Sequence, residues 1–214
     1  MFAHTTILNW ARKYGEIISE YAETLKPELG DIWHADEMKI KTKRQDWAWL
    51  WHVMDSETRY MVANLITKHR EKEDAKDILS SAKTHSQGEK PELVITDGLQ
   101  SYHEAFNEVL YDNHQTCEHV AAAGLRARVN NNRVERLHNT VRERNKTMRG
   151  LQNDDTATEF NNGFKAFYNH IRPHQALKGK TPAQAAGIDL KLGRNRWMGM
   201  IQKSVKHQRN NDAQ

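Results

Sequence analysis

Hydrophobic residues recur at helical spacing in the first segment of the chain, residues 5–25. The apolar stripe of this segment consists of Ile7, Trp10, Tyr14, Ile17, Ile18 and Tyr21. Positions that repeat every three or four residues fall on one side of a helix, so the pattern predicts an amphipathic helix. Pro27 and Gly30 follow and should end it.

The periodicity changes to that of strands in residues 31–66. The segment IWHADEMKI is extended, with Asp36 in its middle, and a basic loop, KTKRQD, follows it. Next comes DWAWLWHVMD, which is apolar on both faces and therefore predicts an interior strand. RYMVANLI is the third strand, and the short connections predict an antiparallel meander. We interpret the series Trp47, Trp49 and Trp51 as core rather than as a platform for stacked bases.

Helices and strands alternate in the next part of the chain. Residues 71–85 have helical spacing, PELVITDG reads as a short apolar strand, and a second helix starts at Leu99. Residues 114–120 fit a fifth strand, and residues 130–150 a further helix. The order β-β-β-α-β-α-β-α predicts an α/β domain. Its mixed five-stranded sheet combines the meander with parallel strands and is flanked by helices.

The C-terminal part predicts further helices and a basic tail. Two helical segments follow residue 150, and the segment from Lys191 is either a helix or a disordered arm. We therefore expect a helix at 1–30, a core at 31–188 that includes the C-terminal helices, and a basic tail at 189–214.

Charge is unevenly distributed along the 214 residues, although the formal net charge is only +4. Residues 39–44 hold four Lys or Arg, and residues 190–209 hold six with no acid. Such basic clusters favour a nucleic-acid partner. The single cysteine, Cys117, excludes an internal disulfide and fits a reducing compartment. With no signal-peptide pattern and no apolar run of membrane-spanning length, we expect a cytoplasmic protein at the nucleoid and no membrane contact.

One acid, Glu135, lies in a strongly basic helix. Residues 126–149 contain eight Lys or Arg and two acids. A carboxylate that faces a polyanion needs a compensating charge, and a divalent cation between the two would supply it. The alternative is a solvated helix of mixed charge.

Three carboxylates fall at positions that the predicted topology can bring together. Asp36 lies mid-strand, where a charge is unfavourable unless it is paired or bound to metal. Asp97 ends a parallel strand, where α/β sheets place their ligands, although it could also be a turn residue. Glu135 lies on a helix that can cross the same edge. Such a set suits Mg²⁺, and two ions about 4 Å apart can clamp the attacking and leaving oxygens of a phosphoryl transfer. Asp55 is the alternative candidate if Asp36 is not a site residue.

Four motifs together resemble a known family. They are HADEM, VITDGLQSY, NNRVERLHNTVRER and YNHIRPHQALKGKTPAQAAG. Over residues 30–188 the chain resembles the DDE transposases of prokaryotic insertion sequences, relatives of retroviral integrases with a ribonuclease-H-like fold. The resemblance implies that Asp36, Asp97 and Glu135 are the catalytic metal ligands for Mg²⁺ or Mn²⁺, with two ions expected. It also implies that Arg142 contacts the transposon end.

The resemblance further implies a double-stranded DNA partner, both transposon ends and target, and at least a homodimer on DNA. The expected DNA-binding residues are Arg133, Arg136, Asn139, Arg142, Lys146, Arg149, Lys41, Lys43 and Arg44. The expected reaction is nicking at the ends followed by strand transfer. Two alternatives are a non-catalytic remnant that binds DNA as an inhibitor, and a structure-specific nuclease of the same fold. Family members carry a DNA-binding domain before the core, and residues 1–30 could be the last helix of one.

Overall fold

The computed structural model describes residues 3–42, 47–111, 116–122, 131–147, 151 and 154–212. The chain forms two compact units. The first runs from residue 28 to residue 158, and the second combines residues 1–27 with residues 159–214. In the described part of the chain, no helix is both long and apolar enough to cross a membrane.

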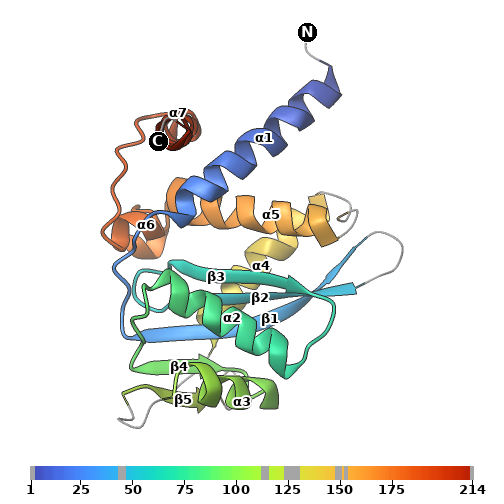
Figure 1. Ribbon diagram of the computed structural model, residues 1–214, viewed down its shortest axis with the longest axis vertical. Helices are drawn as coiled ribbons and strands as arrows, with labels where there is room; N and C mark the ends of the chain where they lie inside the picture. The colour runs from blue at the N-terminus through green and yellow to red at the C-terminus, as the bar shows by residue number, and fades with distance from the viewer. Residues whose placement is uncertain are drawn as a thin grey trace. The chain divides into compact units, whose positions relative to one another are not determined.

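A five-stranded sheet forms the centre of the unit at residues 28–158 (Figure 1). Its strands are β1 (Ile32–Lys41), β2 (Trp47–Asp55), β3 (Met61–Thr67), β4 (Leu93–Thr96) and β5 (Glu118–Ala121). The strand order is β3-β2-β1-β4-β5, with β1 in the middle. β1, β2 and β3 pair antiparallel, whereas β4 pairs parallel to both β1 and β5. This mixed sheet and its element order confirm the predicted fold.

The ends of the strands do not coincide. β1 pairs with β4 only over Ile32, Trp33 and His34, whereas its pairing with β2 continues to Lys41. The C-terminal half of β1, which contains Asp36, therefore extends past the β4 pairing. This leaves room beside β1 for the side chain of the residue that follows β4.

Helices lie on both faces of the sheet (Figure 1). α2 (Lys72–His85) packs on β3 and β2, and α3 (Gln100–Val109) packs on α2. On this face the ring of Trp51 meets the ring of Tyr102 edge-on, with 5.6 Å between centroids. α4 (Asn132–Thr147) packs on β1 and β2 from the other face, where Val134, Leu137 and Val141 are buried.

The tryptophan series on β2 is only partly core. Trp51 is completely buried and Trp49 is half-buried, but Trp47 is 51% exposed. The prediction that all three belong to the core is therefore wrong for Trp47. The pairing of β3 with β2 ends at Trp49, so that, among the described strands, β1 alone pairs with β2 at Trp47.

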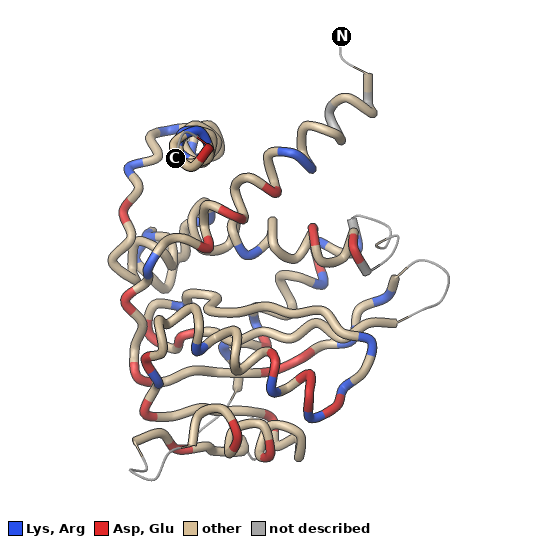
Figure 2. Tube along the Cα trace, viewed as in Figure 1, with Lys and Arg blue, Asp and Glu red and all other residues tan. Residues whose placement is uncertain are grey.

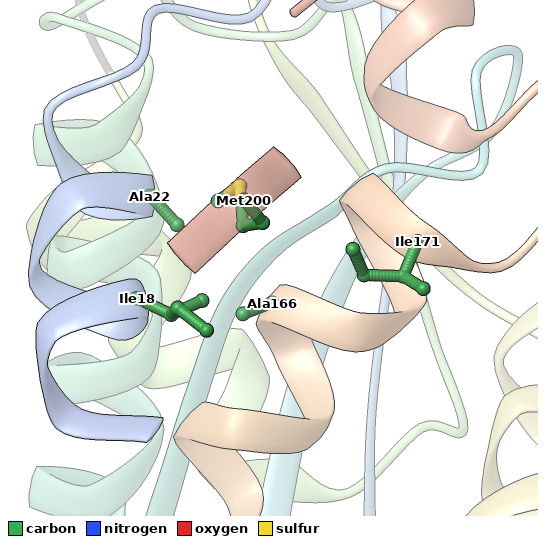
Figure 3. Packing of buried hydrophobic residues seen from close by; sticks show 5 residues of the cluster. All are labelled: Ile18, Ala22, Ala166, Ile171 and Met200. Carbon is green, nitrogen blue, oxygen red and sulfur yellow. The ribbon is translucent and has the colours of Figure 1, made fainter. Parts of the chain in front are cut away.

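The unit made from both chain ends is helical. α1 (His4–Glu23) packs against α7 (Arg196–Asn211). The unit also contains the end of α5 (Asp154–Ala166), the π-helix η1 (Phe167–Ile171), the 3-10 helix η2 (Gln175–Leu177) and α6 (Pro182–Ala185). Ile18, Ala22, Ala166, Ile171 and Met200 form its buried cluster (Figure 3). The basic tail thus contains a packed helix, one of the two states predicted for it. The predicted domain limits at residues 30 and 188 stay a prediction.

Candidate active site

Three carboxylates converge at the edge where β1 extends past β4. Asp36 and Glu37 are neighbours in mid-β1 and so point to opposite faces of the sheet. Asp97 directly follows β4 and can approach β1 from the side. Each of the three offers an oxygen atom, and these atoms all lie within 4.8 Å of one another. The predicted pair Asp36 and Asp97 is therefore brought together, with Glu37 as a third member.

Asp36 is a carboxyl group in an unfavourable setting for its charge. Its side chain is buried, with the whole residue 9% exposed. Burial, followed by the nearby charges of Glu37 and Asp97, raises the pKa of Asp36 to about 8. Without a cation, Asp36 is therefore mostly protonated at neutral pH. A bound divalent cation would reverse this preference.

Glu37 is held by an arginine that also reaches Asp97. The Arg70 guanidinium donates from Nε to Glu37 Oε1 at 2.5 Å and from Nη2 to Asp97 Oδ2 at 3.2 Å. Burial and the charge of Asp97 raise the pKa of Glu37, and Arg70 opposes this shift. Glu37 is not one of the site residues expected from the sequence. Its place in the central strand beside Asp36 was a signal of burial, but nothing in the local sequence pointed to Arg70.

Glu135 occupies the first turn of α4 and is half-buried. Among the described residues, the 4.8 Å group consists of Asp36, Glu37 and Asp97 and does not include Glu135. The charge of Glu135 nevertheless contributes to the raised pKa of Asp36, so the two carboxyl groups are electrostatic neighbours.

The start of α4 is fixed to β1 by buried hydrogen bonds. Asn131, just before the helix, donates from Nδ2 to the carbonyl oxygen of Ala35 at 3.0 Å. Its Oδ1 lies 3.0 Å from Nδ1 of His34, whose Nε2 lies 3.2 Å from the Ser56 hydroxyl. Arg133 donates to the carbonyl and hydroxyl oxygens of Ser56. These contacts determine where the first turn of α4, and with it Glu135, meets the sheet.

His138, one turn further along α4, lies against Asp36. Its Nδ1 is 3.4 Å from Asp36 Oδ2, and its Nε2 is 3.2 Å from His52 Nδ1. Burial, followed by the charge of His52, lowers the pKa of His138 well below its usual value, so the ring is neutral at pH 7. No defined role for His138 follows from the sequence. The structure makes it a direct neighbour of Asp36.

Asp55, the substitute for Asp36, is committed to a turn. It is completely buried and accepts hydrogen bonds from the backbone N–H of Gly30 at 3.1 Å and of Thr58 at 2.8 Å. The Thr58 hydroxyl also donates to it. Because these hydrogen bonds occupy its oxygens, Asp55 stabilises the β2–β3 connection. It does not belong to the carboxylate group of Asp36, Glu37 and Asp97.

The expected DNA-binding residues that the structure describes lie on the exposed face of α4 and at one end of β1. Five of them are exposed on α4: Arg133, Arg136, Asn139, Arg142 and Lys146. Arg142 donates to Asn139 at 3.0 Å, and Lys146 pairs with Glu143 at 2.7 Å. Arg133 is engaged with Ser56, and Lys41 is exposed at the end of β1. Lys43, Arg44 and Arg149 lie outside the described residues. Figure 2 shows how acids and bases are distributed along the chain.

The mixed sheet with helices on both faces, and with acids where β1 passes the end of β4, has the ribonuclease-H-like architecture. The chain belongs to the DDE-domain family of IS240 transposases, whose family model matches residues 30–174. No curated protein matches the sequence significantly.

Two solved structures support the fold. One is a chain of the simian T-cell lymphotropic virus intasome in complex with PP2A regulatory subunit B56 gamma. It has a TM-score of 0.55 and 17% identity, and the match covers 77% of this chain and 57% of that one. The other is the catalytic core domain of HTLV-2 integrase in complex with magnesium, with a TM-score of 0.50, 18% identity, and coverage of 76% and 98%. This chain thus spans little more than half of the first relative. At these identities the likeness shows the fold alone.

Proposed function

We propose that this protein is a DNA transposase that nicks the ends of its element and joins them to target DNA in a metal-dependent reaction. The observation that carries the proposal is the buried carboxyl group of Asp36 on the central strand, with an Asp97 oxygen within 4.8 Å. A family match over residues 30–174 supports it. The proposed catalytic residues are Asp36, Asp97 and Glu135.

The donor atoms suit a hard divalent cation. Carboxylate oxygens are the ligands that Mg²⁺ and Mn²⁺ prefer. Burial, followed by the charges of the neighbouring acids, raises the pKa of Asp36, and a bound divalent cation would favour its ionised form. Asp36, Asp97 and Glu135 would hold the ions, of which we propose two. When bound, such ions make an attacking oxygen more nucleophilic and stabilise the departing one.

The surrounding residues would position these acids. Asn131 fixes the start of α4, which carries Glu135, and neutral His138 packs against Asp36 and restricts its orientation. Arg70 donates a hydrogen bond to Asp97. The exposed bases of α4 would contact phosphates of double-stranded DNA. Joining two element ends requires both in one complex, so we propose at least a dimer on DNA.

A strand-transfer assay tests the proposal. The substrate is a precut duplex with the inverted-repeat sequence found beside the gene, with Mg²⁺ or Mn²⁺ added. Wild type should give joined product, Asp36→Asn none, and the exposed control Asp77→Asn wild-type amounts. Cut but unjoined DNA would instead identify a structure-specific nuclease, and bound but unaltered DNA a non-catalytic inhibitor. Joined product from Asp36→Asn would refute the catalytic assignment.

A further inference from the structure

An alternating series of indoles and cations runs from the carboxylates of Glu37 and Asp97 to the exposed end of β2. We call Trp47, Lys39, Trp49 and Arg70 the indole–cation ladder. Lys39 Nζ lies 5.0 Å from the ring centroid of Trp47 and 5.8 Å from that of Trp49. The guanidinium carbon of Arg70 lies 4.9 Å from the ring of Trp49. Arg70 in turn bonds Glu37 and Asp97, so the ladder begins at the candidate active site.

The strand register explains why these side chains line up. One face of β1 carries every second residue, namely Glu37, Lys39 and Lys41. Their respective partners on β2 are Trp51, Trp49 and Trp47. Trp51 is buried beneath Tyr102, whereas the next two positions become progressively more exposed. Trp47 is 51% exposed, and Lys39 and Lys41 beside it are exposed as well.

The chemistry of the ladder selects a polyanion with flat apolar faces. Cations that track a backbone, combined with indoles that stack on bases, are the usual means of binding single-stranded nucleic acid. An acidic peptide would satisfy the cations but offers no flat surface for Trp47. In a paired duplex the bases stack on one another, so only an unpaired base or a duplex end offers a free face.

We propose that the indole–cation ladder is a subsite for an unpaired DNA segment next to the reacting phosphate, with a base stacked on Trp47. This inference rests on the proposed function, because it takes DNA as the substrate. Extended strands rise about 3.3 Å per residue, which places Lys41 and its partner Trp47 roughly 17 Å along β1 from Asp36. At about 3.4 Å per nucleotide, this corresponds to roughly five nucleotides.

The test measures binding of the full chain, in EDTA, to a labelled single strand and to the same sequence in a covalently closed circular duplex, which has no free end. Fluorescence anisotropy reports the binding. Trp47→Ala should weaken single-strand binding by about 5- to 100-fold, as expected for the loss of one stacked base, and duplex binding by less than about twofold. Trp47→Phe should retain most of the affinity. Tyr111→Ala is the matched control, since Tyr111 is an aromatic residue of the same unit that is 46% exposed and does not belong to the ladder, and it should bind like wild type.

Two results would overturn the subsite. One is unchanged single-strand binding in Trp47→Ala, and the other is an equal loss on single strand and duplex. Lys39→Ala should weaken both ligands and lower the log–log salt slope by about one unit, because it removes a phosphate contact. Since no metal is present, the result is independent of catalysis. An inactive protein that still shows the Trp47 effect would refute the transposase proposal alone, and an active one without it would refute the subsite alone.

Discussion

Asp36 is a residue at which the requirements of folding and of the proposed chemistry conflict. A buried carboxyl group beside two others is a poor choice for stability, because burial and like charges both oppose its ionisation. The same crowding provides a site for a divalent cation. The energetic balance at this residue should therefore depend on pH and on metal.

The metal-free protein should lose stability as the pH rises from about 4 to about 8. In the unfolded chain Asp36 releases its proton near 3.8, whereas in the folded protein its pKa is about 8. Between these values the folded state binds the extra proton, so the free energy of unfolding falls with increasing pH, by roughly 2–5 kcal/mol in all. Urea denaturation in EDTA at several pH values measures this slope. Asp36→Asn should remove most of it, and an identical slope in the variant would contradict the raised pKa.

Added Mn²⁺ should stabilise the wild type at pH 8, because a ligand that binds only the folded state shifts the equilibrium by mass action. Asp36→Asn should lose most of that gain while its metal-free thermal midpoint is unchanged or higher. The apparent metal affinity should weaken as the pH falls below about 8, because protons then compete for Asp36. Equal Mn²⁺ stabilisation of both proteins would remove Asp36 from the metal site.

Arg70→Ala should destabilise the protein, because it leaves the buried carboxylate of Glu37 without its cation. Loss of one partner of a buried pair costs about 3–5 kcal/mol, and the partial exposure of Arg70 reduces this to about 2–3 kcal/mol. The double variant Arg70→Ala with Glu37→Gln should cost less than the sum of the single changes, because the uncompensated charge is gone. Urea denaturation at pH 7 measures all three, with exposed Arg136→Ala as the control. Strict additivity would show that the pair is not coupled.

At the scale of elements, the attachment of α4 to β1 determines where Glu135 meets the sheet. Asn131→Ala would remove one hydrogen-bond partner from the Ala35 carbonyl and one from the His34 ring. This should lower the free energy of unfolding by about 1–3 kcal/mol. Strand transfer should fall too, because the first turn of α4 loses its anchor. The control is Asn139→Ala, an exposed change on the same helix. Similar unfolding free energies for the two variants would argue against the anchor.

The exposed face of α4 should govern the salt dependence of duplex binding. Each of Arg142→Ala and Lys146→Ala removes a cation that would displace a counterion from DNA, so the log–log salt slope should fall by about one unit per variant. Binding titrations over a range of salt concentrations measure it. Glu143→Gln on the same helix retains every cation and should keep the wild-type slope. An unchanged slope in both basic variants would place the DNA elsewhere.

At the scale of the whole molecule, one chain builds two cores, and the second is made from both chain ends. Met200 of α7 is completely buried with Ile18 and Ala22 of α1, whereas Met198 on the same helix is 50% exposed. Met200→Ala should therefore lower the free energy of unfolding by about 2–5 kcal/mol, and Met198→Ala by less than about 0.5 kcal/mol. Urea denaturation of the full chain compares them. Equal effects would mean that α7 does not pack as described.

Much of the fold was predictable because periodicity is local. The change from helical to strand spacing near residue 31, and back near residue 71, depends only on residues close in sequence, and it gave the element order. Asp36 and Asp97 stood out because one interrupts an apolar strand and the other ends one. The likeness of the motifs around Glu135 to a known family completed the candidate site. The comparisons support the family and the fold, whereas the roles of these three residues stay a proposal.

The tertiary structure decided what depends on distant partners. Arg70 meets Glu37 across 33 positions and Asn131 meets Ala35 across 96, so neither contact has a local signal. Trp47 looks like core in sequence, yet it is exposed because β3 no longer pairs with β2 there. The sequence of the tail was compatible with a helix or with a disordered arm. The structure shows a helix, because Met200 is buried against α1. Spacing along a chain shows which face a side chain takes, but only strand register and packing determine what it meets there.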